Sequence, residues 1–312
     1  MAARGMLSEL KVAVPWGHIA AKVWGSQQTP PVLCLHGWLD NANSFDRLIP
    51  LLPKDFCYVA MDFGGHGLSS HYSPGLPYYQ ESFVSEIRRV VAALKWKQFS
   101  ILGHSFGGTV GGMFSSIFPE MVNKLILLDT WPFALDPKGI ERVPIYRRGA
   151  MEHVLQVEAS QKPLQVVSPE DMLQRFMKNN SHVSEENARL LLQRGTTKVA
   201  TGLMLNRDRR IALPEHSMDF ISREQFVHFT KQLRARVLLI KAAQGYYSVR
   251  REDDTDRNIV AFVTDTLKLV LKERYQYMEV PGSHYVHLNQ PEKVAGSISA
   301  FLQCKETIPH HL

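Results

Sequence analysis

The hexapeptide Gly103-His104-Ser105-Phe106-Gly107-Gly108 constrains the fold more than any other stretch of this chain. An apolar run at residues 99–102 precedes it and a second apolar stretch at 109–118 follows it, so we expect a strand, a sharp turn and a helix. In a G-x-S-x-G turn the serine backbone is strained, and side chains two residues away on either side would obstruct it. The following helix directs its first N–H groups and the positive end of its dipole towards the turn. The motif therefore predicts a nucleophile at Ser105, beside a place where an oxyanion would be stabilised.

Strand-like and helix-like segments alternate along the rest of the chain. Eight segments are expected to be strands, at residues 10–14, 18–24, 32–35, 56–61, 99–102, 125–128, 237–240 and 275–280. Helical spacing follows or separates them at residues 45–52, 79–94, 109–118, 256–271 and 292–302. The first two strands flank Pro15-Trp16-Gly17 and predict an antiparallel hairpin, whereas the later alternation predicts parallel strands. We therefore expect an α/β fold with a mostly parallel eight-stranded sheet flanked by helices.

The alternation is interrupted in the middle of the chain. Residues 131–226 contain helical patterns at 151–157, 169–178 and 185–193 but no strongly strand-like run, and three prolines mark the start of the segment. We interpret residues 131–226 as an inserted helical cap, residues 1–130 and 227–304 as the core domain, and residues 305–312 as a loose tail.

Composition excludes several classes of protein. With 312 residues, 45% of them hydrophobic, the chain is long enough to bury a large core, and it lacks the roughly 18 to 20 consecutive apolar residues of a membrane span. Cys34, Cys57 and Cys304 have no neighbouring Cys or His at metal-ligand spacing, and we expect reduced thiols. The net charge is +6, and residues 138–236 hold 17 basic against 11 acidic residues, but the basic residues are scattered. We therefore interpret the basic residues of this segment as part of a solvated surface, and we expect no nucleic-acid partner.

Residues able to carry chemistry follow several of the predicted parallel strands. They are His36-Gly37-Trp38, Asp62, Ser105, Asp129 and Gly282-Ser283-His284. Because the carboxyl ends of parallel strands meet at one edge of a sheet, we expect a serine, an aspartate and a histidine to lie near one another.

The combination of these motifs resembles the α/β-hydrolase fold family, and in particular its serine hydrolase-like branch. The resemblance extends from about residue 12 to residue 302 and rests on His36-Gly37-Trp38, Asp62-Phe63-Gly64-Gly65-His66-Gly67-Leu68-Ser69, the turn at Ser105, and Pro281-Gly282-Ser283-His284 followed by Asn289-Gln290-Pro291. It implies that Ser105 is the nucleophile and His284 the general base, with the backbone N–H groups of Trp38 and Phe106 as the oxyanion hole. His287 is the alternative base. We prefer His284 because it directly follows the Pro-Gly-Ser turn.

The acid of this constellation departs from the commonest pattern of the family. Many relatives carry an aspartate five or six residues after the strand at 237–240, where this chain has Gly245. Some members place the acid after the preceding strand instead, and Asp129 occupies that place. Asp253 and Asp254 are alternatives if their loop folds back.

The resemblance implies a carboxylesterase-like serine hydrolase that cleaves an ester or thioester of a small or medium acyl substrate through an acyl-enzyme, without a metal or organic cofactor. A serine at position 105 argues against epoxide hydrolases and haloalkane dehalogenases, which use an aspartate there. A serine-based perhydrolase or carbon–carbon bond hydrolase, and a weak or inactive ligand-binding or scaffold protein, are the alternatives. We expect a cytoplasmic location first and a peroxisomal one second, because the C-terminal His310-His311-Leu312 shares its last residue with the S-K-L address read by a peroxisomal import receptor.

Overall fold

Alternate residues of the central strands enter two separate hydrophobic cores. In β3 (Pro31–Leu35), Leu33 and Leu35 belong to one core, whereas Val32 and Cys34 belong to the other. All five residues of β4 (Cys57–Met61) are buried. Because both faces of the sheet are covered, these strands are continuous apolar runs rather than alternating ones, which is why they were recognisable in the sequence.

The computed structural model describes residues 7–135, 139–160, 163, 165–245 and 254–304. Its main sheet has eight strands in the order β1-β2-β4-β3-β5-β6-β10-β11. The strands not yet given are β1 (Leu7–Val14), β2 (Gly17–Trp24), β5 (Phe99–His104), β6 (Val122–Leu128), β10 (Arg236–Gln244) and β11 (Tyr275–Ser283). The β1–β2 and β2–β4 pairs are antiparallel, and every other neighbouring pair is parallel. The expected α/β fold with a mostly parallel eight-stranded sheet is confirmed.

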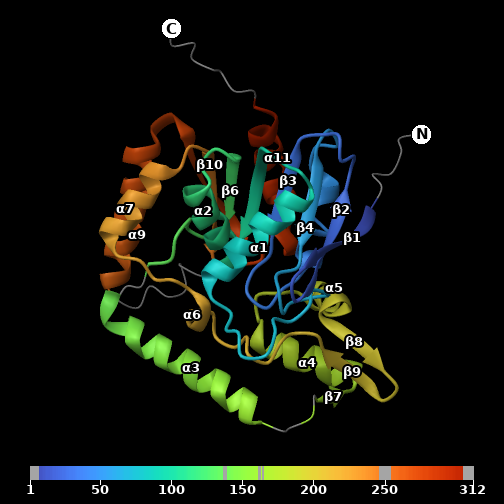
Figure 1. Cartoon of the computed structure of the whole chain (residues 1–312). Coiled ribbons are helices and arrows are strands. Elements are labelled where there is room, and N and C mark those ends of the chain that lie inside the picture. Colours follow the sequence, from blue (N-terminus) through green and yellow to red (C-terminus); the bar gives the residue numbers. More distant parts are fainter. Residues whose placement is uncertain (1–6, 136–138, 161–162, 164, 246–253, 305–312) are drawn as a thin grey trace, which may run out of the picture.

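Helices cover both faces of this sheet (Figure 1). Side chains of α1 (Gln80–Ala93), α2 (Phe106–Ile117), α7 (Arg223–Gln232) and α9 (Asp254–Leu271) join the core that contains Leu33. The opposite core is closed by α11 (Glu292–Gln303) and by the chain between Ala42 and Leu52.

One helix predicted from spacing is not formed. Residues 45–52 were expected to be helical, but the structure has two short 3-10 helices, η1 (Ala42–Phe45) and η2 (Ile49–Leu51), on either side of a turn. Pro50 lies at the start of η2 and has no N–H to donate to a preceding turn. The apolar side chains Phe45, Leu48, Ile49 and Leu52 are buried nevertheless, so the spacing reported burial and not an α-helix.

The segment at residues 131–226 lies beyond the carboxyl ends of the parallel strands (Figure 1, green to yellow). It contains α3 (Val143–Ala159), α4 (Pro169–Asn179), α5 (Glu185–Gly195) and α6 (Pro214–Ser217), and three of these include the helical patterns seen in the sequence. The sequence showed no strongly strand-like run in this segment, and the structure adds three short strands. A small antiparallel sheet of order β7-β9-β8 joins β7 (Val166–Val167), β8 (Thr196–Val199) and β9 (Gly202–Leu205).

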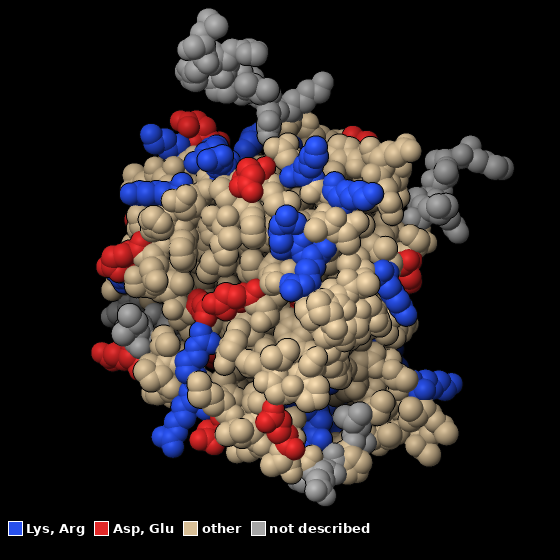
Figure 2. All heavy atoms as spheres, viewed as in Figure 1, with Lys and Arg blue, Asp and Glu red and all other residues tan. Residues whose placement is uncertain are grey.

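Charged side chains of both signs are interspersed on the face seen in Figure 2, without a broad area of one sign. This agrees with the scattered basic residues of the sequence. Among the residues that the structure describes, no helix is long and apolar enough to cross a membrane. The C-terminal His310-His311-Leu312 lies outside the described residues.

Candidate active site

Ser105 lies in a sharp turn between β5 and α2. Its backbone has φ 51° and ψ −123°, a strained conformation for a residue with a side chain. The two flanking glycines are required by close approach of the backbone. A Cβ at position 107 would lie 2.3 Å from the carbonyl oxygen of Leu35, and a Cβ at position 103 would lie 2.5 Å from the Cα of Gly108. The G-x-S-x-G pattern thus serves the turn as the sequence predicted.

A continuous hydrogen-bond chain joins three of the predicted site residues. The Oγ of Ser105 is 2.9 Å from Nε2 of His284, and Nδ1 of His284 is 2.6 Å from Oδ2 of Asp129. The carboxylate accepts a hydrogen bond from the Nδ1–H group, so Nε2 carries the lone pair that faces the serine hydroxyl. The side chain of His284 is 15% exposed and that of Asp129 only 1%, so the imidazole is reachable from solvent while its carboxylate partner is shielded.

Asp129 is held firmly at the end of β6. Its N–H donates to the carbonyl of Ile240 at 2.7 Å, and its Oδ1 accepts from the N–H of Ala242 at 3.0 Å. Its φ of 48° turns the side chain towards His284. Of the alternative acids, Asp253 and the side chain of Asp254 lie outside the described residues.

Gly245 leaves the space that the Asp129 carboxylate fills. A Cβ at position 245 would lie 2.2 Å from Oδ2 and 2.4 Å from Oδ1 of Asp129. Because β6 and β10 are neighbours in the sheet, the loops at their ends reach the same place beside the histidine. A side chain at position 245 and a carboxylate from position 129 therefore exclude each other here.

The other histidines of the motifs lie elsewhere. His287, the alternative base, is fully buried with Nε2 2.9 Å from the Oγ of Ser44, and burial lowers its pKa to about 3. His36 accepts the N–H of Phe63 through Nε2, and His66 packs its ring 5.6 Å from that of Trp38. Asp62 is also buried, and its carboxylate binds Arg194 at 2.8 Å. None of these four is hydrogen-bonded to Ser105, so they serve the surrounding loops.

A buried polar cluster behind His284 was not identified from the sequence. The Nε2 of His104 donates to the backbone carbonyl of His284 at 2.9 Å, and the hydroxyl of Tyr285 donates to Oδ1 of Asp40 at 3.0 Å. Burial raises the pKa of Asp40 to about 7. These contacts attach the loop that carries His284 to the turn before Ser105 and to the loop that carries Trp38. Partners so distant in the chain give no local signal, although His104 belongs to the turn motif and Asp40 follows His36-Gly37-Trp38 by two residues.

The backbone N–H of Trp38 comes from the loop after β3 and that of Phe106 from the first residue of α2, and the two side chains are in contact. The two rings pack edge to face at 4.8 Å, and the indole N–H of Trp38 donates to the carbonyl of Ala212 at 2.9 Å. Neither of these backbone N–H groups donates a hydrogen bond to another residue in the described part of the chain. Both groups are therefore available as donors.

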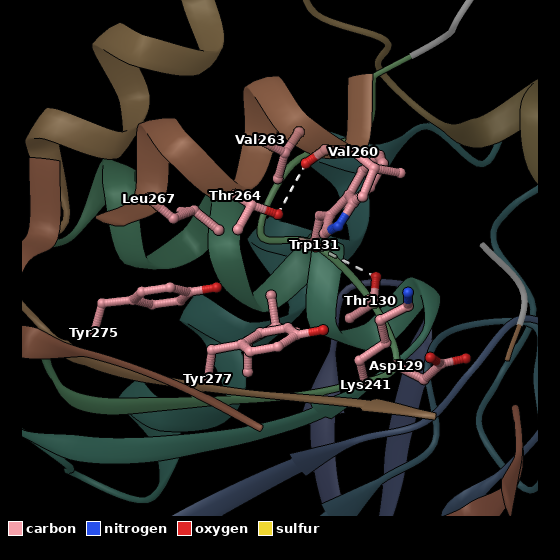
Figure 3. Close-up of a pocket in the computed structure, with 11 residues that line it drawn as sticks. Asp129, Thr130, Trp131, Lys241, Val260, Val263, Thr264, Leu267, Tyr275 and Tyr277 are labelled. Carbon is pink, nitrogen blue, oxygen red and sulfur yellow. Dashed lines mark hydrogen bonds between the residues drawn. The ribbon is translucent and has the colours of Figure 1, made fainter. Parts of the chain in front are cut away.

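A small cavity reaches Asp129 from the side of α9 (Figure 3). Its volume is about 30 Å³, which is room for one or two water molecules and not for an acyl group. In Figure 3 the carboxylate of Asp129 lies at the edge of the lining, away from Tyr275 and Tyr277. This cavity is therefore not the place where a substrate would meet Ser105.

Comparisons with known proteins agree with this architecture. The family described as alpha/beta hydrolase fold matches residues 30–245. Serine hydrolase-like protein of Mus musculus is 67% identical over 300 residues, covering 96% of either chain. Serine hydrolase-like protein 2 of Homo sapiens is 65% identical over 311 residues, covering 100% of this chain and 99% of its own.

Solved structures show the same fold. A hypothetical protein from Pseudomonas aeruginosa PAO1 has a TM-score of 0.79 and 29% identity, covering 94% of this chain and 99% of its own. A thioesterase domain from the curacin biosynthetic pathway has a TM-score of 0.75 and 20% identity, covering 95% and 99% of the two chains, which shows likeness of fold alone. The elbow at Ser105, the eight-stranded sheet and the long matches to serine hydrolase-like proteins agree: the chain belongs to the α/β-hydrolase fold family, in its serine hydrolase-like branch.

Proposed function

We propose that this hydrolase cleaves a carboxylic ester or thioester through an acyl-enzyme formed on Ser105. The observation that carries the proposal is the continuous hydrogen-bond chain from the Oγ of Ser105 through His284 to Asp129. A serine hydroxyl is a weak nucleophile until a base takes its proton, and an imidazole nitrogen that faces the hydroxyl at 2.9 Å is suited to that role.

The reaction would proceed in two halves. As Oγ attacks the substrate carbonyl carbon, its proton passes to Nε2 of His284, and Asp129 stabilises the resulting imidazolium through Nδ1. The carbonyl oxygen becomes an oxyanion that accepts from the N–H groups of Trp38 and Phe106. The imidazolium then protonates the departing alcohol or thiol. Water, deprotonated by the same nitrogen, attacks the acyl-enzyme and releases the acid and free Ser105.

In this proposal residues 131–226 act as the cap over the site. Contacts between this segment and the loops around Ser105 support the assignment: Asn41 donates to the carbonyl of Leu191 at 2.9 Å, and Trp38 donates to that of Ala212. A cap held this closely suits a small or medium acyl group.

A fluorophosphonate probe tests the proposal because it reacts only with an activated serine. We expect wild-type protein to be labelled at Ser105 and to hydrolyse p-nitrophenyl acetate or butyrate, and Ser105→Ala to do neither. Circular dichroism and the thermal melting temperature should show that both proteins are folded. Labelling of wild type no greater than that of Ser105→Ala would refute the hydrolase and favour a ligand-binding or scaffold role.

The alternative serine chemistries use the same three side chains, so they are separated by products. Peroxyacid formation from an acid and hydrogen peroxide would indicate a perhydrolase, and cleavage of a 1,3-diketone would indicate a carbon–carbon bond hydrolase. We expect ester or thioester turnover to exceed both.

A further inference from the structure

A cleft lined by arginines lies between the segment 205–210, the last turn of α3 and the loop around Pro74. Its volume is about 300 Å³, ten times that of the cavity beside Asp129. The charged side chains in its lining include Arg207, Arg209 and Arg210 on the positive side and Glu158 and Asp208 on the negative side. The question is which of these charges are neutralised by the protein itself.

Arg210 and Asp208 neutralise each other. The guanidinium of Arg210 is 2.7 Å from Oδ2 of Asp208, and its remaining donors bind the carbonyls of Tyr72, Ser73 and Leu76. Asp208 also accepts the hydroxyl of Tyr78 at 2.9 Å. The opposite charges of this pair balance at one wall of the cleft, where Nδ1 of His71 also lies 3.4 Å from Oδ2 of Asp208.

Arg207 has no such partner among the residues that the structure describes. Within the described part of the chain, no hydrogen bond or ion pair involves its guanidinium, although the residue is half-buried and burial lowers its pKa. Removing a guanidinium from water without a compensating acceptor is costly, and such a charge is well suited to an anion that binds two of its N–H groups. Arg209 is exposed and donates to the Oγ of Ser160, and Glu158 is exposed, where water screens its repulsion of an anion.

The cleft lies across the Gly65–His66 loop from Trp38, and neither Ser105 nor His284 is among its lining residues. The N–H of Asp208, next to Arg207, donates to the carbonyl of Gly65 at 2.9 Å, and the following His66 packs against Trp38. The positive charge of Arg207 lowers the pKa of His66, after the larger effect of burial, so the two side chains are close. One layer of side chains thus separates Arg207 from the loop that would supply an oxyanion donor.

We propose that this cleft holds an anionic group of the substrate, a carboxylate or a phosphate, against Arg207. The inference rests on the proposed ester or thioester hydrolysis and narrows its substrate to an acyl compound with a negative charge remote from the scissile bond. That charge has two possible sources: a carboxylate at the far end of the acyl chain, or a phosphate on a thiol leaving group.

Anion binding can be measured without turnover. Isothermal titration with inorganic phosphate and with glutarate should show binding to wild type that Arg207→Gln weakens about 10- to 100-fold, the range for loss of a charged hydrogen bond. The control Arg189→Gln removes a cation from α5, outside the cleft, where Arg189 forms an exposed ion pair with Glu185. This variant should bind the anions like wild type. Glu158→Gln should strengthen binding. No binding by wild type, or equal binding by Arg207→Gln, would overturn the proposal.

Matched substrates identify the source of the charge. The first pair is p-nitrophenyl hemiglutarate and p-nitrophenyl valerate, and the second is butyryl-coenzyme A and butyryl-N-acetylcysteamine. In one of the two pairs, Arg207→Gln should raise KM and so lower kcat/KM of the charged member about 10-fold or more, and should leave kcat/KM of the neutral member unchanged. The pair that responds in this way identifies the source of the charge. Unchanged ratios for both pairs would contradict the inference while leaving the hydrolase intact. Failure of the hydrolase itself would appear instead as no turnover of any substrate that depends on Ser105.

Discussion

At the scale of single residues, positions 129 and 245 compete for one place beside the imidazole. The carboxylate of Asp129 occupies the space that a side chain at position 245 would need, because a Cβ there would lie 2.2 Å from Oδ2. Gly245 was the reason to consider a weak or inactive protein as an alternative. The same glycine leaves room for the Asp129 carboxylate, which follows β6, to contact His284. At Gly245, where many relatives carry the acid, this chain has no carboxylate, and the one that contacts His284 follows the neighbouring strand β6.

Asp129→Asn tests the contribution of this acid. An amide that donates towards Nδ1 would favour the wrong imidazole tautomer, and we expect kcat for ester hydrolysis to fall by about 10⁴-fold with little change in melting temperature. Steady-state kinetics on p-nitrophenyl butyrate measure the effect. Activity within about tenfold of wild type would mean that Asp129 does not orient the base.

Gly245→Ala should disturb the same contact from the other side. The added methyl group would push the carboxylate away from His284, and a displacement of that order is expected to cost about 10²-fold in kcat. In the Asp129→Asn background the same change should cost much less, because the contact is already lost. Gly296→Ala is the matched control, since the added methyl group would meet no described atom within 4 Å beyond the adjoining residues and backbone of its own helix. That variant should retain full activity and gain about 0.5 to 1 kcal/mol of stability in its helix.

The site was partly predictable at this scale. Ser105 carries a local signature because the turn itself requires the flanking glycines, and His284 follows a recognisable turn. Asp129 stayed open in the sequence because its role depends on β6 and β10 being neighbours and on the empty space at Gly245. Arg207 belongs to no motif, and that it has no partner among the described residues becomes visible only when the surrounding side chains are placed.

At the scale of elements, burial on both faces made the central strands predictable. Their apolar runs differ from the observed limits mainly at the ends, where pairing continues into polar residues such as Lys241. The strands of the small sheet have two to four residues each, too few for a periodic pattern to emerge. The failure at residues 45–52 has another cause, since apolar spacing reports which side chains are buried and not which backbone carries them.

Arg194 joins α5 to the core through a buried ion pair. Its side chain is 4% exposed and contacts Asp62, which is fully buried, as well as Glu9 on β1, which is 58% exposed. Arg194→Met would leave the Asp62 carboxylate buried without its cation, and we expect the free energy of unfolding to fall by about 3 to 5 kcal/mol. Glu9→Gln should cost less than about 1 kcal/mol.

Urea denaturation of the two variants and wild type measures this difference. The double variant Arg194→Met/Asp62→Asn should recover part of the lost stability, because it removes the unpaired charge. Equal small losses for Arg194→Met and Glu9→Gln would show that the link between α5 and the core does not depend on the buried pair.

At the scale of the whole molecule, buried ionisable groups couple folding to pH in opposite directions. Burial lowers the pKa of His66 to about 4, so protonation of the unfolded chain destabilises the fold as pH falls below the ordinary histidine range. Burial raises the pKa of Glu86 to about 8, so the folded protein keeps a proton there that the unfolded chain has lost. For such a group, stability is fully present below the unfolded pKa and is lost as pH rises to the folded value.

Glu86→Gln isolates this second effect in the stability of the whole chain. Glu86 is fully buried on α1 and binds the N–H of Gly64 at 2.9 Å and the hydroxyl of Tyr72, contacts that a neutral amide can also make. The quantity to follow is the stability difference, the free energy of unfolding of wild type minus that of the variant. This difference should fall by up to about 1.36 kcal/mol per pH unit between pH 5 and about 8, and then level off. Urea titrations at pH 5 to 9 measure it. Glu152→Gln, an exposed change on α3, should give a flat difference, and an equally flat line for Glu86→Gln would mean that the carboxyl is ionised in the folded protein throughout.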